Sequence, residues 1–491
     1  MEITNLILNN NSETADKKSF NKNSNDKKVY IETYGCQMNY SDTERVAAVL
    51  EKSGYEKADQ LDEVDLFIFN TCSIKQKGED RVYGIIKNIG MMKKANPRLL
   101  IGITGCMVRQ TSSRNTEWEG KDDLLKNLKP LDFVFRITDT HKLPQVLAEA
   151  GPQLDLPELS ESTGQSRTDY LQVAPQYSTK FQAFVPIQIG CDKYCTYCIV
   201  PYSRGREESR PMEDILAECR KLVENGCKEI TLVGQTVNSY GLSNLDQKSP
   251  RFNWYHQVKT TIRPELPFIR LLRQLNGLSE LGLNRLRYTS PHPRDLSDQL
   301  IEAHATLKVL CPYIHLPVQS GDNQVLARMN RKYTVEEYRE KVAKLLARVP
   351  NCVITTDIIV GFCGETDEQF QNTAKLFEEI AWDQAYISRY SERQGTVAGN
   401  LFQDDVPTEV KASRWHTLNN LLKKISKEKH QKYLGQTLEV LIERYNPLTK
   451  EIEGRSREMK VVQIPATGPE LVGQIQSVKI TAAKDWVLKG R

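Results

Sequence analysis

The sequence predicts an α/β protein made of three consecutive units, and three observations along the chain carry this prediction. Apolar segments of strand character alternate with helical stretches over residues 29–150. The alternation resumes over residues 181–430 with six strand-like segments, and beyond residue 431 short strands follow without a helical period. Because strands separated by helices form parallel sheets, we expect a parallel α/β domain, then a partial (βα)6 barrel, then a small antiparallel β-barrel at 431–491.

Three further segments have the composition of tails or loops. Residues 1–28 are rich in Asn, Ser, Lys and Asp, which predicts a disordered tail. Residues 151–180 are polar, with Pro, Ser and Gly, and are expected to form a linker. Residues 243–265 lack periodicity, which predicts a surface insertion in one connection of the second unit.

In the first unit, Ser41 and Glu44 have the spacing of a capping box, which predicts a helix over residues 45–52. Compact apolar or alternating segments predict its strands at 29–33, 64–69 and 99–104. Strands of the second unit are expected at 184–189, 229–233, 285–288, 313–316, 353–360 and 384–388, with helices such as 212–224, 335–346 and 367–379 between them. Strands of the third unit are expected at 438–442, 459–464, 471–475 and 478–481.

Composition bears on compartment and partners. The net charge of +4, from 67 basic and 63 acidic residues, neither indicates nor excludes a nucleic-acid partner. No segment resembles a secretory signal, and no apolar run approaches the roughly 20 residues that cross a bilayer. We therefore expect a cytoplasmic protein with no membrane partner. In that compartment clustered cysteines indicate metal binding or redox chemistry more than disulfides.

The sharpest chemical signal is the Cys191-x-x-x-Cys195-x-x-Cys198 motif after the first strand of the second unit. Three thiolates on one tight loop suit a 4Fe–4S cluster whose fourth iron stays open to a substrate. A structural zinc site is the alternative, but it prefers four closed ligands, and no fourth Cys or His lies nearby in sequence.

A second set consists of Cys36, Cys72 and Cys106, each of which follows a predicted parallel strand. Because the carboxyl ends of parallel strands share one edge, these thiols are expected to converge on a second three-ligand site. The alternative is three unrelated buried cysteines. The other five lack ligand spacing and are expected to be core or surface residues: Cys219, Cys227, Cys311, Cys352 and Cys363.

Over about residues 29–491 the chain resembles the methylthiotransferase family of radical S-adenosylmethionine enzymes. The resemblance rests on Thr33-Tyr-Gly-Cys-Gln-Met-Asn39, Asn70-Thr-Cys-Ser-Ile74, Thr104-Gly-Cys-Met107, Gly190-Cys-Asp-Lys-Tyr-Cys-Thr-Tyr-Cys-Ile-Val-Pro201, Gly205-Arg-Glu207, Ser290-Pro-His-Pro293, His315-Leu-Pro-Val-Gln-Ser-Gly321, Met329-Asn-Arg-Lys-Tyr333 and Thr356-Asp-Ile-Ile-Val-Gly361. It implies a methylthiotransferase N-terminal domain, a radical domain built as the partial barrel, and a C-terminal RNA-binding β-barrel of the TRAM type.

Within this family, Gln37, Met38 and Asn39 after the first cysteine are similar to the branch that adds a methylthio group to carbon 2 of N(6)-dimethylallyl adenosine at tRNA position 37, next to the anticodon. Branches acting on threonylcarbamoyl adenosine or on a ribosomal protein usually have Lys or Pro there, and a paralogous activity of that kind is the alternative. A non-catalytic iron–sulfur RNA-binding protein is the alternative of another class, and the complete three-cysteine motif speaks against it.

The resemblance implies two 4Fe–4S clusters, and S-adenosylmethionine as both methyl donor and radical source. It also implies a tRNA substrate, an electron donor such as a flavodoxin or ferredoxin, and a supplier of sulfur or clusters. Contacts to S-adenosylmethionine are expected from Gly234, Gln235, Ser290 and Gln319, which follow barrel strands, where ligands gather. Gly234 permits close backbone approach, with an ordinary turn glycine as the alternative.

The chain departs from the family pattern at Thr236, where Asn is usual, and at Cys363, where Pro is usual. We expect neither to touch a cluster cysteine. In the third unit, basic residues near predicted turns are expected to meet tRNA, with an ordinary solvated surface as the alternative: Arg444, Arg455, Arg457 and Lys460.

Overall fold

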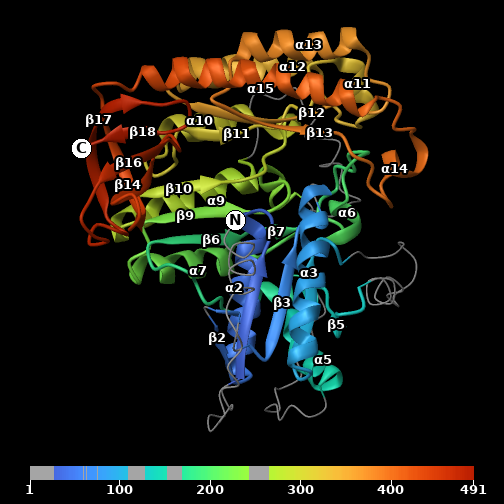
Figure 1. Ribbon diagram of the computed structural model, residues 1–491. Helices are drawn as coiled ribbons and strands as arrows, with labels where there is room; N and C mark the ends of the chain where they lie inside the picture. The colour runs from blue at the N-terminus through green and yellow to red at the C-terminus, as the bar shows by residue number, and fades with distance from the viewer. Residues whose placement is uncertain are drawn as a thin grey trace.

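The computed structural model describes residues 27–58, 60–61, 64–73, 76–108, 128–151, 168–242 and 265–491, and Figure 1 shows its three units in chain order. The expected tail lies outside the described residues except for Lys27 and Lys28, which begin the first strand. Most of the expected linker and all but Glu265 of the expected insertion also lie outside them.

The N-terminal unit is a five-stranded parallel sheet in the order β2-β1-β3-β4-β5. Its two central strands are buried along their whole length, with alternate side chains packing into separate cores on the two faces. Helices therefore cover both faces, as a parallel sheet requires. The elements are β1 (Lys27–Thr33), α2 (Gln37–Lys52), β2 (Tyr55–Lys57), β3 (Leu66–Thr71), α3 (Gln76–Ala95), β4 (Leu100–Gly105), β5 (Phe133–Val134), η2 (Ile137–Lys142), α5 (Leu143–Ala150) and η3 (Asp169–Gln172).

Helix α2 begins earlier than expected, at Gln37, with Cys36 as its N-cap residue. The predicted capping box is wrong, because both of its side chains make contacts far along the chain. The Ser41 hydroxyl donates to the carbonyl oxygen of Phe184 at 3.2 Å, and Glu44 accepts hydrogen bonds from the backbone and hydroxyl of Ser178. These two residues attach α2 to the second unit.

The second unit is the expected partial barrel of six parallel strands. Two three-stranded sheets, β10-β9-β6 and β11-β12-β13, are joined by a bridge between Leu286 and Leu310. The strands are β6 (Gln182–Pro186), β9 (Glu229–Val233), β10 (Arg285–Tyr288), β11 (Tyr313–His315), β12 (Val353–Val360) and β13 (Gln384–Arg389). The outer helices are α7 (Met212–Glu224), α9 (Pro267–Asn276), α10 (Asp298–Thr306), α12 (Val335–Arg348) and α13 (Asp367–Ile380).

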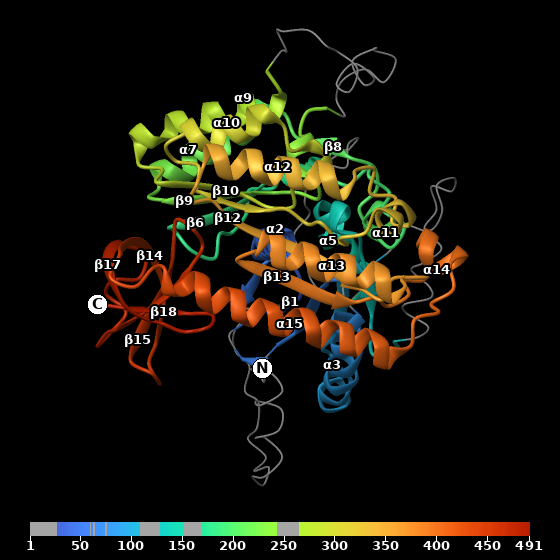
Figure 2. The same cartoon turned by 90° about the horizontal axis from the view of Figure 1, so that it is seen from above.

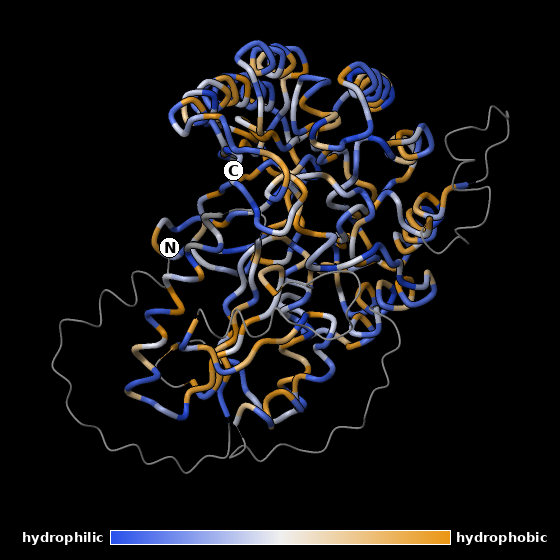
Figure 3. The backbone as a smooth tube through the Cα atoms, turned by 90° about the vertical axis from the view of Figure 1, so that its right-hand side faces the viewer, coloured by the Kyte–Doolittle hydropathy of each residue, from blue (hydrophilic) through white to orange (hydrophobic). Residues whose placement is uncertain are grey.

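Short elements lie in the connections between the barrel strands, most of them on the carboxyl side. The expected strand at 184–189 is divided, because its last two residues leave β6 and form an antiparallel pair with a later segment. These elements are β7 (Gln188–Ile189), α6 (Val200–Ser203), β8 (Glu208–Ser209), η4 (Val237–Ser239), η5 (Gly277–Leu281), η6 (Pro293–Asp295), α11 (Asn323–Arg328) and α14 (Val397–Leu401). In Figure 3 hydrophilic and hydrophobic colours both recur along the helices, which is the pattern of helices with one buried face.

A long helix, α15 (Thr408–Gln431), runs beside β13 to the C-terminal unit (Figure 2). That unit is a closed five-stranded barrel in the order β14-β15-β16-β18-β17, antiparallel except between β16 and β18. The strands are β14 (Thr437–Asn446), β15 (Glu451–Ser456), β16 (Val461–Pro465), β17 (Ile475–Ala483) and β18 (Leu488–Gly490). The strand expected at 471–475 is wrong, since β17 begins at Ile475, and β15 and β18 were not expected.

The C-terminal barrel docks on β9 and β10 through buried arginines. Arg285 and Arg287 of β10 both pair with Glu229 of β9, and they donate to the carbonyl oxygens of Arg455 and Arg457. Burial raises the pKa of the Glu229 carboxyl, but Arg287 and Arg285 overcome this and hold that pKa below its usual range.

The basic side chains expected to meet tRNA are largely engaged within the chain. Arg457 donates to the backbone of Asn284 and Lys308, and the buried Lys460 ammonium pairs with Asp383 of the second unit at 2.8 Å. The other two pair with carboxylates of the barrel itself, Arg444 with Glu453 and Arg455 with Glu443. The expectation is therefore wrong for the buried Lys460, which holds the barrel against the second unit as Arg457 does, and it stays a prediction for the other three residues.

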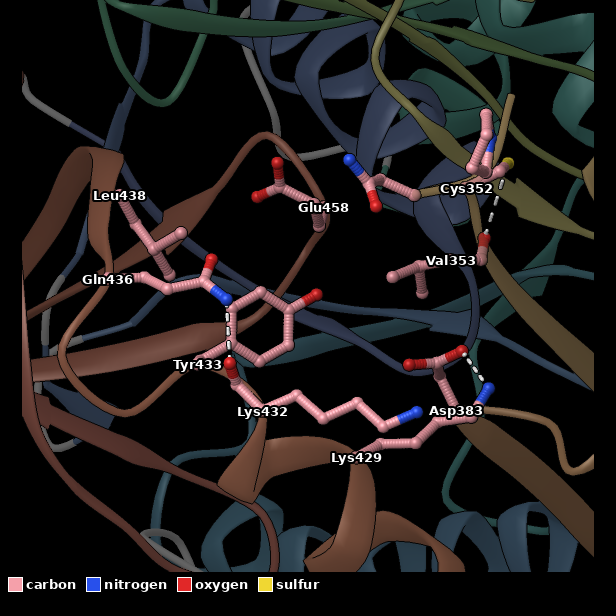
Figure 4. A pocket seen from close by; sticks show the side chains of 11 residues that line it. Cys352, Val353, Asp383, Lys429, Lys432, Tyr433, Gln436, Leu438 and Glu458 are labelled. Atoms are coloured by element: carbon pink, nitrogen blue, oxygen red, sulfur yellow. Dashed lines mark hydrogen bonds and ion pairs between the residues drawn. The ribbon is translucent and has the colours of Figure 1, made fainter. Parts of the chain in front are cut away.

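A cavity of about 360 Å³ opens beside this junction. Figure 4 shows Asp383, Lys429, Lys432, Tyr433 and Glu458 around it. Lys429 at the end of α15 donates to Asp383 at 2.8 Å, so one carboxylate receives two ammonium groups.

No helix in the described part of the chain is long and apolar enough to cross a membrane.

Candidate iron–sulfur sites

The Cys191 loop is held in a tight turn against the segment that follows it. Gly190 has a φ of +78°, and a β-carbon there would lie 2.0 Å from the carbonyl oxygen of Arg206. The backbone N–H of Cys191 donates to Gly205, and that of Cys198 donates to Cys195. Cys191 and Cys195 are buried and Cys198 is half-buried, so the loop gathers three thiols with little solvent around them.

Two side chains reach sulfur atoms of this loop. Cys191 Sγ and Thr236 Oγ1 share a hydrogen bond of 3.1 Å, and the buried Arg331 guanidinium donates to Cys195 Sγ at 3.3 Å. The expectation that the departure at Thr236 touches no cluster cysteine is wrong. For Cys363 it fits the structure, since this residue packs with Phe362 in a separate apolar cluster.

Sequence reasoning missed Arg331. It lies in the motif Met329–Tyr333, but no spacing in the sequence connects that motif to Cys195. In the structure the motif supports the cysteine loop: the Thr196 N–H donates to the Met329 carbonyl, and Asn330 Nδ2 donates to the Tyr194 carbonyl.

Burial and neighbouring thiols oppose the ionisation of Cys191 and Cys198. Burial raises the pKa of Cys191 to about 11. Burial, and after it the charges of Cys195 and Cys191, raise the pKa of Cys198. Thiolates crowded in this way become favourable when metal ions supply compensating positive charge. The donor set and its surroundings therefore fit a cationic cluster.

The second set of cysteines follows β1, β3 and β4, at one edge of the N-terminal sheet. A β-carbon on Gly35 would lie 2.8 Å from Cβ of Cys72, and the Cys106 N–H donates to the Thr71 carbonyl at 2.8 Å. The three cysteine-bearing segments are therefore in direct contact. Cys36 is exposed, Cys72 half-buried and Cys106 buried, so the site opens to solvent on one side.

Buried asparagines fix these segments relative to one another. Asn39 Nδ2 donates to Asn70 Oδ1 and to the Thr71 carbonyl, and Asn70 Nδ2 donates back to the Asn39 carbonyl at 2.7 Å. Cys36 Sγ donates to Asn39 Oδ1 at 3.4 Å. Both asparagines belong to motifs that carry the family resemblance, but only the fold shows that they meet.

Within the described residues, no three His, Cys, Asp or Glu side chains could hold a single metal ion. A 4Fe–4S cluster makes a different demand, because each thiolate binds a different iron. Each set meets this demand with three neighbouring thiols.

The four residues expected to contact S-adenosylmethionine lie after β9, β10 and β11. Gly234 packs on Gln188, where a β-carbon would come within 2.9 Å of Cγ. Gln235 has a buried Oε1 without a hydrogen-bond partner in the described structure. Ser290 and Gln319 have φ values of 58° and 72°, a strained conformation that clusters at functional sites.

Comparisons with known proteins agree with this architecture. The Radical SAM superfamily matches residues 185–377, the Uncharacterized protein family UPF0004 matches 28–126, and the TRAM domain matches 431–491. The solved structure of a radical S-adenosylmethionine methyltransferase from Kitasatospora setae superposes with a TM-score of 0.52 at 13% identity, over 76% of this chain and 75% of that one. At that identity the likeness concerns the fold alone.

Two curated relatives carry the same name. The tRNA-2-methylthio-N(6)-dimethylallyladenosine synthase of Geobacillus kaustophilus is 40% identical over 467 residues, which cover 94% of this chain and 82% of the relative. That of Thermoanaerobacter sp. is 40% identical over 464 residues, covering 94% and 92%. This chain therefore belongs to the family of tRNA-2-methylthio-N(6)-dimethylallyladenosine synthases.

Proposed function

We propose that this chain is a cytoplasmic radical S-adenosylmethionine methylthiotransferase. It places a methylthio group on carbon 2 of N(6)-dimethylallyl adenosine in tRNA, at position 37 next to the anticodon. The observation that carries the proposal is the presence of two separate three-thiol sites in one chain, one on the barrel loop and one at the edge of the N-terminal sheet. Family membership supports the choice of substrate.

Cys191, Cys195 and Cys198 would hold one 4Fe–4S cluster, and Cys36, Cys72 and Cys106 would hold the other. When bound, the barrel cluster would supply an electron for cleavage of S-adenosylmethionine to a carbon radical, and the N-terminal cluster would hold the sulfur that is methylated and transferred. Radical chemistry is needed because the hydrogen on carbon 2 of adenine is not acidic, so no side-chain base removes it.

The chain's own residues hold these sites in place and keep water out. Arg331 and Thr236 bind the sulfur atoms of Cys195 and Cys191, and Asn330 fixes the loop backbone between them. Asn39 and Asn70 hold the segments of the second site. Because these side chains are fixed by hydrogen bonds, both sites are expected to keep the same geometry when substrates bind and leave.

Gly234, Gln235, Ser290 and Gln319 are proposed to bind S-adenosylmethionine. The unpartnered Gln235 Oε1 favours this role, since a buried acceptor without a donor is costly unless a ligand provides one. The positive φ values of Ser290 and Gln319 also favour a role in binding S-adenosylmethionine. A flavodoxin or ferredoxin is proposed as electron donor, and a separate supplier of sulfur or clusters is required.

Cysteine variants test the two-site proposal. After anaerobic reconstitution, replacing Cys191, Cys195 and Cys198 by Ala is expected to abolish cleavage of S-adenosylmethionine. Replacing Cys36, Cys72 and Cys106 by Ala is expected to leave about half of the iron, retain cleavage and yield no methylthio product. Cys219→Ala is the matched control, because this thiol is fully buried in the apolar core behind the barrel strands.

The outcome is read from iron and sulfide analysis, deoxyadenosine formation and nucleoside mass spectrometry on the same samples. Wild-type iron content in either triple variant would contradict the assignment of those cysteines. Product containing threonylcarbamoyl adenosine, or a modified ribosomal protein, would favour a paralogous activity instead.

A further inference from the structure

Arg204 extends from the second unit into the N-terminal unit. It lies six residues after Cys198 and caps the end of α6, where its backbone N–H donates to the carbonyl of Val200, the first residue of that helix. Its side chain is only 3% exposed and pairs through Nη2 with Asp42 Oδ2 of α2 at 2.7 Å. The Tyr170 hydroxyl donates to the other carboxylate oxygen of Asp42.

This ion pair brings Arg204 to the helix that begins beside Cys36. Asp42 lies in the second turn of α2, whose N-cap residue is Cys36. Nη1 of Arg204 is buried and has no hydrogen-bond partner among the described residues. A buried donor left unpaired costs about 1–3 kcal/mol, and more when it is charged, so this nitrogen calls for an acceptor that the described chain does not supply.

The guanidinium of Arg204 keeps its positive charge although it is buried between the two units. Burial lowers the pKa of Arg204, but Asp42, and next the Cys106 thiol, hold that pKa above its ordinary value. The unpaired donor therefore lies beside α2, the helix whose N-cap residue is Cys36.

The barrel site offers a parallel, because there the buried Arg331 donates directly to Cys195 Sγ. An arginine suits both places, since it stays charged and its separate nitrogens serve two partners at once. A lysine paired with Asp42 would have no second nitrogen to offer.

We propose that Nη1 of Arg204 donates a hydrogen bond to sulfur of the N-terminal cluster, either a thiolate ligand or a cluster sulfide. This inference rests on the proposed function, and it makes the segment after Cys198 a contact of both clusters. Hydrogen bonds to the sulfur atoms are among the factors that set the reduction potential of an iron–sulfur cluster. A donor carrying positive charge favours the reduced, more negative state and raises that potential.

The test uses the full-length chain with Cys191, Cys195 and Cys198 replaced by Ala, so that only the N-terminal cluster is present. The reduction potential is measured by redox titration monitored by electron paramagnetic resonance, together with iron content. In this background Arg204→Lys keeps a positive charge paired with Asp42 but has no second nitrogen at the position of Nη1. We expect at least a tenfold change in the redox equilibrium, about 59 mV toward more negative potential.

Asp42→Asn breaks the same ion pair but leaves the guanidinium in place with less compensating charge. The potential is expected to move in the opposite direction, toward more positive values. Arg45→Lys is the matched control, because Arg45 is another buried arginine between the units but pairs with Glu218. It is expected to leave the potential unchanged.

An Arg204→Lys variant that retains iron and the parent potential would overturn the role of Arg204 and leave the cluster assignment intact. Shifts of equal size and direction in Arg204→Lys and Asp42→Asn would also overturn it, since they would reflect only the loss of packing between the units. A background protein without iron would overturn the assignment of Cys36, Cys72 and Cys106, and this inference with it.

Discussion

Asp383 joins three parts of the chain, because its carboxylate precedes β13 and receives ammonium groups from α15 and from the C-terminal barrel. The two distances are 2.8 Å each, to Lys429 and Lys460. The Lys460 side chain is 6% exposed and that of Lys429 is 27% exposed. Replacing Asp383 and replacing Lys460 are therefore expected to lower the free energy of unfolding by different amounts.

Asp383→Ala leaves the buried Lys460 charge without a partner, and breaking a buried pair in this way costs about 3–5 kcal/mol. Lys460→Met leaves Asp383 paired with Lys429 and keeps an apolar stem in the same space, so the expected cost is about 1–2 kcal/mol. The structure thus predicts a larger loss from removing the acid than from removing the base.

Both variants are measured by calorimetric and urea unfolding of anaerobically purified protein. The exposed Arg444 serves as control, and Arg444→Ala is expected to change the free energy of unfolding by less than about 0.5 kcal/mol. Because Lys460 faces the second unit, Lys460→Met is expected to leave the salt dependence of tRNA binding unchanged. Equal losses from Asp383→Ala and Lys460→Met, or the reverse order, would refute this reasoning.

Three further outcomes are expected. Gly105→Ala should reduce iron by about half and leave S-adenosylmethionine cleavage intact, since a β-carbon there would lie 2.3 Å from the Thr71 carbonyl oxygen beside the N-terminal site. Gly54→Ala, with a similar positive φ but nothing within 4 Å, should keep full iron, and equal losses would contradict the assignment. Thr236→Val should retain iron but shift the potential of the barrel cluster to more negative values, and an unchanged titration would argue against the hydrogen bond to sulfur. Burial lowers the pKa of His304 from 6.5 to about 4, so the folded state favours the neutral ring; this contribution to the free energy of unfolding is complete above pH 6.5 and is lost as the pH falls toward 4. Between pH 7 and 5 the wild type should therefore lose about 2 kcal/mol more than His304→Gln, measured by urea unfolding. Equal losses in the two proteins would contradict the pKa shift.

Much of the fold is readable in the sequence where local pattern and burial agree. The bounds predicted for β9, β10, β12 and α7 match those of the structure, because apolar runs mark β9 and β12, alternation marks β10, and a clean helical period marks α7. The strands of the small C-terminal barrel were harder to predict from the sequence. β15 reads Glu-Ile-Glu-Gly-Arg-Ser and has few apolar residues, and its Gly454 faces the bulge of β14, where a β-carbon would meet the Leu441 carbonyl at 2.1 Å.

Contacts between units could not be predicted from local spacing. Ser41 and Glu44 match a capping box in sequence, but their partners Phe184 and Ser178 lie more than a hundred residues away. The same holds for Lys460, which contacts the second unit, and for Thr236, which contacts Cys191 within the second unit, because folding alone brings these elements together.

The cysteine positions were the most predictable part of the candidate sites. Spacing on one loop defines the barrel set, and placement after β1, β3 and β4 defines the other. Their ligation of clusters stays a prediction, as do the contacts to S-adenosylmethionine. The arginines Arg204 and Arg331 were not foreseen, because a charged side chain gives no sign in the sequence of which sulfur it faces.

The most direct test of the central claim is mass spectrometry of tRNA nucleosides from a strain that lacks this enzyme, with and without the chain restored. We predict that the chain converts N(6)-dimethylallyl adenosine to its 2-methylthio form, and that the Cys36, Cys72 and Cys106 triple Ala variant leaves the precursor unmodified. Persistence of unmodified precursor in the strain carrying the wild-type chain, with cleavage of S-adenosylmethionine demonstrated in the purified protein, would contradict the claim.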